Sequence, residues 1–355
     1  MSRFLSDEYK DLTPYTPGEQ PKIKSLIKLN TNECPYPPSP AVLEALTSEQ
    51  ILDLRLYPDP LATPLIESIA DHFGLDAEQI IVGNGSDEIL AFCFMAFQNS
   101  GRRIYYPEIS YGFYPVYANV FGAKGKAVPL DGNLRINIED YKNLDGTIII
   151  ANPNAPTGIA LEPEEIEEIL ITNKDNLVII DEAYIDFGGR SCAPLIRDHD
   201  NLMIIQTFSK SRALAGARIG FALGSPEMIK DINKIKFSFN PYNLSRLSIL
   251  AGAAAMRDVD YFKKCTDEIQ KTRDSFVKAM EKLGFEVLPS SANFVFAKNP
   301  KISGEAYYVL LRKKNILVRH FNKKPIEDYV RITIGLPSDM DALLAVTEKI
   351  LEGEK

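Results

Sequence analysis

The sequence predicts an α/β protein with a large domain, built on a mostly parallel central sheet between helices, and a smaller α+β domain. Between about residue 79 and residue 225, short apolar runs alternate with helical patterns. The runs are continuous rather than alternating in polarity, which is typical of strands buried on both faces. After about residue 240, fewer strand-like runs lie among charged helical stretches, and this change indicates the second domain.

The N-terminal part is expected to lead into the sheet through an irregular stretch and two helices. Prolines are too dense in the first forty residues for a helix interior. One helix begins near Ala41, and a second runs from Thr63, a candidate N-cap followed by Pro64, to Gly74. Buried strands are then expected at residues 80–82, 103–105, 148–150, 178–180, 203–205 and 219–222.

The C-terminal third is expected to open with a long helical stretch from Ser245 to Leu283, interrupted near Asp258. Further along the chain we expect strands at residues 285–288 and 294–296, a helix near 305–314, strands around 317 and at 330–334, and a final helix from 339. This order assigns residues 35–240 to the large domain, and residues 1–34 with 241–355 to the small domain.

Composition argues against several classes of function. The 355 residues carry 40 Lys and Arg against 48 Asp and Glu, for a formal net charge of −8. A polyanion needs a basic surface, so neither nucleic acid nor a membrane surface is expected as a partner. The four cysteines have no CxxC spacing and the three histidines are dispersed. We therefore expect no metal site, no disulfide scaffold and no serine triad.

The N-terminal ten residues are polar and include no apolar segment of the kind found in secretory leaders. The longest apolar runs are far shorter than the ~20 residues that cross a bilayer. A cytoplasmic location is the expectation that follows.

Polar residues concentrate where the predicted strands end, which is where doubly wound sheets bind ligands. The segments in question are residues 83–88, 152–158, 181–184 and 207–220. Taken singly, each reads equally well as an ordinary turn, a capping acid or a surface lysine. Their order along one sheet is the stronger signal, because together they supply what pyridoxal phosphate (PLP) requires. That cofactor needs a lysine for its aldehyde, an acid for its ring nitrogen, an aromatic face and phosphate donors.

On these motifs the chain resembles the fold-type I PLP-dependent aminotransferases and is similar to their histidinol-phosphate branch. The similarity runs almost end to end, through residues 14–18, 29–33, 57–60, 83–88, 111–112, 152–158, 181–187, 207–220 and 330–335. The resemblance implies transfer of an amino group from L-histidinol phosphate to 2-oxoglutarate, which gives imidazole acetol phosphate and L-glutamate in histidine biosynthesis. The alternatives are a threonine-phosphate decarboxylase of the same fold, an aminotransferase for aromatic amino acids, and a PLP-binding regulatory module without turnover.

The resemblance also implies catalytic roles for individual residues. Lys210 would bind the cofactor as a Schiff base and carry the 1,3-proton transfer, as general base and then acid. Asp181 would pair with the pyridinium nitrogen, which keeps the ring an electron sink. Tyr184 would hydrogen-bond the ring hydroxyl, and Tyr111 would stack on the ring.

For the cofactor phosphate, the resemblance implies a larger set of residues: Ser86, Asp87, Thr207, Ser209 and Arg218. Asp87 would act through its backbone N–H. Tyr57 matches a family tyrosine that reaches the cofactor phosphate of the other subunit, so a homodimer would be needed for a complete site.

For the substrate, the resemblance implies that Arg331 and Arg319 bind the phosphate group with help from Tyr15. Planar guanidinium groups suit this task because they bind phosphate with two parallel hydrogen bonds. Arg319 reads equally well as a solvated charge among its basic neighbours.

One position departs from the family pattern. The family has Asn directly before Pro-Thr-Gly, where its side chain donates to the ring hydroxyl, but this chain has Ala155 there and Asn154 one residue earlier. Tyr184 alone, a water molecule or a shifted Asn154 are the three ways in which that hydroxyl could still be held.

Overall fold

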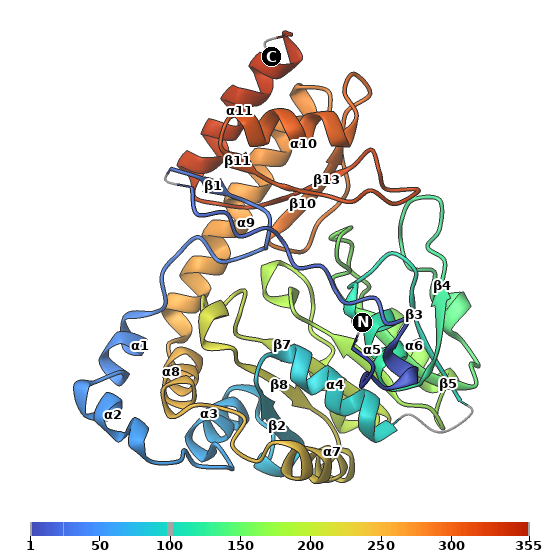
Figure 1. Ribbon diagram of the computed structural model, residues 1–355, viewed down its shortest axis with the longest axis vertical. Helices are drawn as coiled ribbons and strands as arrows, with labels where there is room; N and C mark the ends of the chain where they lie inside the picture. Colours follow the sequence, from blue (N-terminus) through green and yellow to red (C-terminus); the bar gives the residue numbers. More distant parts are fainter. Residues whose placement is uncertain (1, 24, 98–101, 354–355) are drawn as a thin grey trace.

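The protein is described by a computed structural model that covers residues 2–23, 25–97 and 102–353. Its largest sheet has seven strands in the spatial order β2-β8-β7-β6-β5-β3-β4 (Figure 1). They are β2 (Ile80–Gly83), β3 (Arg103–Pro107), β4 (Lys124–Val128), β5 (Gly146–Ala151), β6 (Val178–Asp181), β7 (Leu202–Thr207) and β8 (Gly220–Leu223). Only β8 runs antiparallel to its neighbours β2 and β7. The predicted α/β class and mostly parallel sheet are confirmed.

Helices cover both faces of this sheet, which explains the continuous apolar runs. The helices around it are α3 (Thr63–Phe73), α4 (Ser86–Phe97), α5 (Phe113–Val120), α6 (Pro163–Thr172), α7 (Pro226–Phe239) and α8 (Arg246–Arg257). Ile148 and Ile150 of β5 belong to a core with residues of α3, α6 and α8. Ile149, which points to the opposite face, belongs to a second core with residues of α4, α5 and α7. A strand between two cores has no polar face.

The edge strand β4 was missed by the sequence analysis. Its residues Lys124–Ala127 are exposed, and the strand pairs only with β3. Only Val128 of this edge strand is buried in the core, so the strand needs no apolar run, and its charged residues protect the open edge. The apolar-run signal is therefore absent here.

The start of α3 differs from the expectation in one detail. Ala62 holds the N-cap position and Thr63 is the first helical residue. The capping oxygen comes instead from Asp59, whose carboxylate accepts hydrogen bonds from the backbone N–H groups of Leu61 (2.9 Å) and Thr63 (2.8 Å). Gly74 ends the helix at φ 62°, as expected.

The smaller unit is built on a four-stranded antiparallel sheet in the order β12-β13-β10-β9. Its strands are β9 (Glu286–Val287), β10 (Phe294–Lys298), β12 (Arg319–His320) and β13 (Val330–Thr333), with helices α9 (Val259–Lys282), α10 (Gly304–Lys313) and α11 (Pro337–Leu351). The break near Asp258 is confirmed, because its carboxylate accepts from the Tyr261 N–H (3.2 Å) and caps α9.

The N-terminal segment joins this smaller unit. Strand β1 (Ile27–Lys28) pairs in parallel with β11 (Ile316–Leu317), and two short helices, α1 (Pro40–Ala45) and α2 (Ser48–Leu52), lead on to α3. The domain division remains a prediction, and we propose one change to it. Because Ile249 and Met256 of α8 lie in the same core as Leu65 of α3, the boundary belongs at Asp258 rather than at residue 240.

No helix among the described residues combines the length and the apolar character that a membrane span requires.

Candidate active site

Two adjoining cavities lie where the strands of the large sheet end. The first, of about 200 Å³, is lined by nine of the predicted cofactor residues: Ser86, Asp87, Tyr111, Asp181, Tyr184, Thr207, Ser209, Lys210 and Arg218. The second, of about 390 Å³, is lined by the predicted substrate residues Tyr15, Arg319 and Arg331, and it shares Tyr111, Tyr184 and Lys210 with the first. Tyr57 lines neither cavity. Its side chain is 79% exposed and stacks on Tyr242, with 4.6 Å between ring centroids.

A buried carboxylate marks the floor of the first cavity. Asp181 ends β6 and accepts hydrogen bonds from the Tyr114 hydroxyl (2.9 Å) and the Ala183 N–H (3.2 Å). Burial raises the pKa of Asp181 to about 6. Within the described part of the chain, no Lys or Arg forms an ion pair with it. A cationic ring N–H beside Asp181 would hold it ionised, so the residue fits a pyridinium nitrogen.

Lys210 and Tyr184 lie between the two cavities. The Lys210 ammonium donates to the backbone carbonyl of Thr31 (3.0 Å) and lies 5.7 Å from the centroid of the Tyr184 ring. The Tyr184 hydroxyl accepts a hydrogen bond from the side-chain amide of Asn32 (2.9 Å). Lys210, Tyr184 and Asp181 line the same cavity, so all three could contact a cofactor bound there.

A cluster of donors suited to a phosphate group lines the other end of the first cavity. Ser86 is the first residue of α4, and the N–H groups of a helix start bind anions. The Thr207 hydroxyl donates to the Ser209 hydroxyl (3.0 Å). Arg218 reaches the Asp87 carboxylate (3.1 Å), which also accepts from the Tyr111 hydroxyl (2.7 Å). The Asp87 side chain thus positions Arg218 and Tyr111, and its backbone N–H is left for the predicted phosphate contact.

Two glycines let this cluster form. A Cβ at Gly220 would stand 2.2 Å from the Ser86 nitrogen, and a Cβ at Gly85 would stand 2.4 Å from the Arg218 guanidinium. Gly85 also has φ 81°, in the left-handed region.

We expect Gly85→Ala to weaken cofactor binding by roughly tenfold or more, because displacing Arg218 removes a charge-assisted hydrogen bond of about 1.5–3 kcal/mol. Fluorescence titration of the cofactor-free protein measures this. Gly216 is the matched control, since a Cβ there meets nothing within 4 Å. Equal affinities of Gly85→Ala and Gly216→Ala would contradict the assignment.

On the substrate side, Arg331 is a cation that forms no ion pair with any described residue. Its guanidinium carbon lies 5.3 Å from the Phe294 ring centroid and 5.6 Å from that of Phe321. One terminal nitrogen donates to the Asn30 carbonyl (2.9 Å), whereas its buried Nε has no hydrogen-bond partner in the described part of the chain. Burial lowers the pKa of Arg331. A cation whose buried donor is unsatisfied fits an anionic ligand.

Arg319 and Tyr15 complete the substrate side. In the small sheet, Arg319 of β12 stands directly opposite Arg331 of β13. Its nearest hydrogen bond, to the Thr16 carbonyl, is long at 3.5 Å. The Tyr15 ring stacks on Phe113 with 4.2 Å between centroids. Within the described residues, neither arginine pairs with a carboxylate, so together they offer two positive charges to one ligand.

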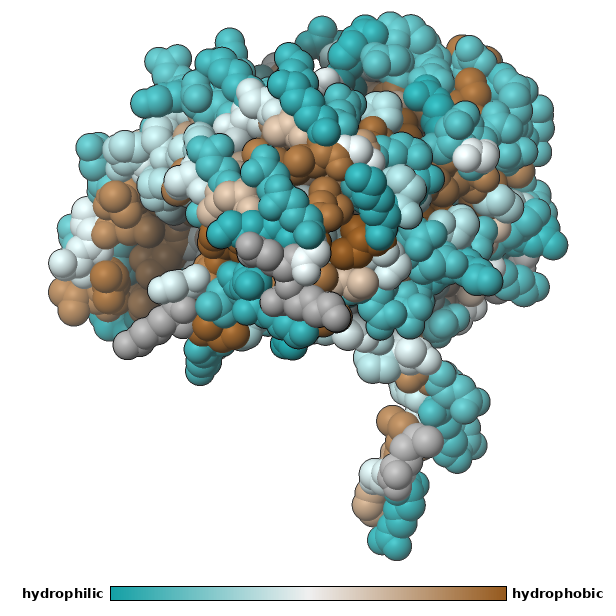
Figure 2. Space-filling model, turned by 90° about the horizontal axis from the view of Figure 1, so that it is seen from above, coloured by the Kyte–Doolittle hydropathy of each residue, from teal (hydrophilic) through white to brown (hydrophobic). Residues whose placement is uncertain are grey.

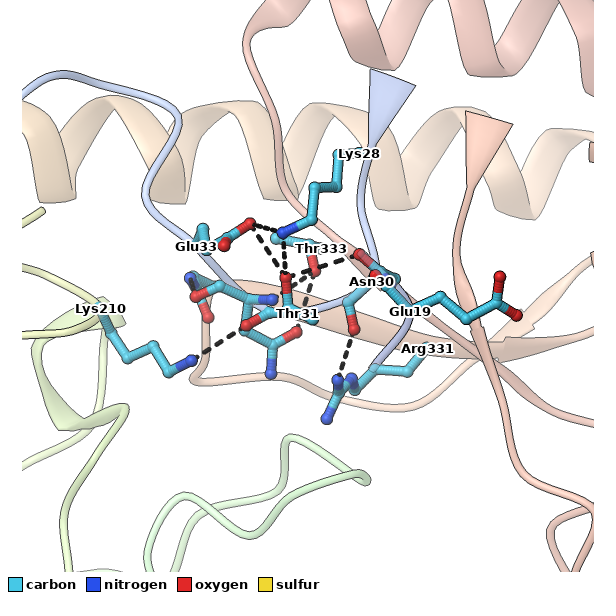
Figure 3. Close-up of polar contacts among 10 residues, drawn as sticks. Glu19, Lys28, Asn30, Thr31, Glu33, Lys210, Arg331 and Thr333 are labelled. Carbon is cyan, nitrogen blue, oxygen red and sulfur yellow. Dashed lines mark hydrogen bonds and ion pairs between the residues drawn. The ribbon is translucent and has the colours of Figure 1, made fainter. Parts of the chain in front are cut away.

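One functional segment was not assigned a role from the sequence. Three successive residues of the N-terminal segment each contact a different site residue, and Figure 3 shows the contacts of Asn30 with Arg331 and of Thr31 with Lys210. The Asn30 carbonyl accepts from Arg331, the Thr31 carbonyl accepts from Lys210, and the Asn32 amide donates to Tyr184. The family motif at residues 29–33 marks this segment in the sequence, but it does not indicate which site residues the segment contacts.

The structure also reduces the alternatives at Ala155. The Asn154 amide donates to the Ile109 carbonyl (3.0 Å) and the Thr157 hydroxyl (3.1 Å), and its oxygen accepts from Ser110 (2.7 Å). Both polar atoms are therefore already engaged, and Asn154 is not among the residues that line either cavity. The idea that a shifted Asn154 replaces the family asparagine is wrong in this structure.

Comparison with known proteins decides the family. Residues 24–346 match the family described as aminotransferase class I and II. The chain belongs to this family. It is 51% identical to a histidinol-phosphate aminotransferase of Brachyspira hyodysenteriae over 99% of this chain and 100% of the relative. Identity to a Clostridium botulinum protein of the same name is 47%, over 99% of each chain. Within the class I and II family, the chain thus belongs with the histidinol-phosphate aminotransferases.

A solved structure extends the comparison to three dimensions. Histidinol-phosphate aminotransferase from Sinorhizobium meliloti, in complex with pyridoxal-5'-phosphate, is 26% identical and has a TM-score of 0.90, with 100% of this chain and 99% of that chain covered. The predicted aminotransferase fold and PLP as cofactor are confirmed. The roles of single residues stay predictions.

Proposed function

We propose that the chain transfers the amino group of L-histidinol phosphate to 2-oxoglutarate, which yields imidazole acetol phosphate and L-glutamate. One structural observation supports this reaction independently of the names of the relatives. Arg319 and Arg331, which pair with no carboxylate of the described residues, line a cavity that shares Lys210 with the cofactor cavity. A substrate phosphate supplies the charge that they lack.

When bound, PLP supplies an electron sink for the pair left on the substrate α-carbon and carries the amino group between the two half-reactions. Lys210 Nζ is the group that would take the proton from the substrate α-carbon and return it to the cofactor. Asp181 would accept a hydrogen bond from the ring N–H and keep the ring protonated. Tyr184 would donate to the ring hydroxyl oxygen, and Tyr111 would stack on the ring.

The phosphate end of the substrate is held by this chain's own charges. Arg331 supplies the unpartnered Nε and Arg319 a second guanidinium, while Tyr15 closes the cavity from the N-terminal segment. The rings of Phe294 and Phe321 flank Arg331 and exclude water from it. A drier surrounding strengthens the attraction between the guanidinium and the phosphate.

The test is to mix holoenzyme with histidinol phosphate and follow the cofactor absorbance from its carbonyl form to its amine form. We expect conversion, reversal by 2-oxoglutarate, and weak conversion by histidinol, which lacks the phosphate. Release of carbon dioxide from threonine phosphate, or faster conversion by aromatic amino acids than by histidinol phosphate, would refute the assignment. Bound PLP that no amino donor converts would favour a regulatory module.

We also propose a homodimer in which Tyr57 reaches the cofactor phosphate of the other subunit. Six further apolar side chains near Tyr57 in the sequence are also exposed: Leu43, Ile51, Leu52, Leu54, Leu56 and Leu61. Apolar side chains gather at the left edge of Figure 2, on the side where Figure 1 places α1 and α2. An apolar patch of this kind on a soluble domain favours a protein partner, here a second copy.

We expect the double variant Leu52→Glu/Leu54→Glu to halve the mass measured by light scattering and to weaken cofactor binding, because each site loses the other subunit's Tyr57. Val309→Glu is the matched control, since Val309 is 42% exposed but lies on α10, outside the patch. An unchanged mass of the double variant would contradict this interface.

A cytoplasmic location is part of the same proposal. The four cysteines are unpaired, as is usual in a reducing compartment.

A further inference from the structure

We infer that Asn32 compensates for Ala155 by holding Tyr184 in the one orientation from which its hydroxyl donates to the cofactor ring oxygen. The inference rests on the proposed function in so far as it assumes bound PLP. Ala155 lines both cavities and packs against Phe294 and Tyr184, so no amide donor comes from that position. The ring hydroxyl is adjacent to the carbon that bears the aldehyde, so its donor must lie near Lys210. Tyr184 does.

The orientation of the Asn32 amide follows from its neighbours. The Thr333 hydroxyl accepts from the Asn32 backbone N–H (3.0 Å) and therefore donates its own hydrogen to the Asn32 side-chain oxygen (2.9 Å). The amide NH₂ must then face Tyr184, whose hydroxyl oxygen lies 2.9 Å away. Asn293 donates to the Asn32 carbonyl (3.0 Å), and the residue is only 1% exposed.

This contact decides what Tyr184 can do. A phenol has one hydrogen to donate, and its oxygen here already accepts from Asn32. Tyr184 cannot donate back to an NH₂ group, so its hydrogen is directed to another acceptor. Because Tyr184 lines both cavities, the ring oxygen of a bound cofactor is well placed to receive it. Asn32 touches neither the cofactor nor the reacting atoms in this account. It is a positioning residue that acts through Tyr184.

Backbone geometry supports the choice of asparagine. Asn32 has φ 56°, in the left-handed region, which asparagine tolerates better than most residues. An alanine there would add backbone strain to the loss of the amide. Glycine removes the side chain without that strain, so Asn32→Gly separates the two effects.

The experiment measures the pH at which the bound cofactor changes colour, in holoenzyme without substrate. A donor to the ring oxygen stabilises its anion, so losing the donor moves the midpoint upward. For one hydrogen bond we expect an upward shift of roughly 0.5–1 pH unit in Asn32→Gly. Asn32→Asp should shift it too, since a carboxylate accepts the Tyr184 hydrogen instead of leaving it for the ring.

A double-mutant cycle with Tyr184→Phe tests the route. If Asn32 acts through Tyr184, Asn32→Gly causes no further shift in the Tyr184→Phe background. The same shift in both backgrounds, or none in Asn32→Gly alone, overturns the inference. Because the titration uses no substrate, a wrong assignment of histidinol phosphate would leave this result intact. Failure of the chain to bind PLP at all would overturn both.

Discussion

Lys210→Ala is expected to lower turnover of histidinol phosphate by about 10⁴-fold, the upper end of what a positioned acid–base group contributes. Lys210 is the only lysine that lines both cavities among the described residues. In the proposed mechanism it would supply both the covalent attachment and the proton transfer, and an alanine supplies neither. The measurement is single-turnover conversion of the cofactor absorbance.

The same variant should still bind PLP, but without a covalent bond. Asp181, Arg218 and the start of α4 are unchanged, so PLP should still bind at equilibrium. Because it is not covalently attached, gel filtration should remove it. Lys234→Ala is the matched control, because Lys234 pairs with Asp231 on the surface of α7. Transamination by Lys210→Ala at a rate near that of the control would refute the role of Lys210.

Arg331→Gln should lower kcat/KM for histidinol phosphate by about 10²–10⁴-fold. Each hydrogen bond between a guanidinium and a phosphate contributes about 1.5–3 kcal/mol, and a bidentate pair makes two. The ligand-free protein should keep its stability despite this loss of activity. Arg331 has no carboxylate partner among the described residues, so its replacement leaves no buried carboxylate unpaired. We expect its free energy of unfolding to change by less than about 1 kcal/mol.

Two comparisons make the Arg331 result specific. Histidinol without its phosphate should react at similar rates with the wild type and the variant, since it has no charge for Arg331 to bind. Arg135→Gln is the matched control, because Arg135 pairs with Glu165 outside both cavities (2.7 Å). Equal losses with phosphorylated and unphosphorylated substrate would assign Arg331 a structural role instead.

The sequence by itself determined the local features. Strands such as Val178–Asp181 are predicted because their buried faces require continuous apolar runs. The helix interruption near Asp258 is also predicted, whereas the capping role of Asp258 is seen only in the structure. The polar segments after the strands indicate the cofactor site, because parallel strands bring their carboxyl ends to one edge of the sheet. Lys210, Asp181 and Arg218 needed only this rule and the family motifs to be placed together.

The tertiary structure alone decided the contacts between distant segments. Asn32 meets Tyr184 and Thr333 across 152 and 301 positions of the chain, and Arg319 stands opposite Arg331 only through the register of β12 with β13. Only the tertiary structure shows the exposed edge strand β4 and the packing of α8 against the large sheet. Periodicity reports which face of an element is buried, but it does not report which partner buries it. That choice is made by packing over the whole molecule, and here it determines how Ala155 is compensated.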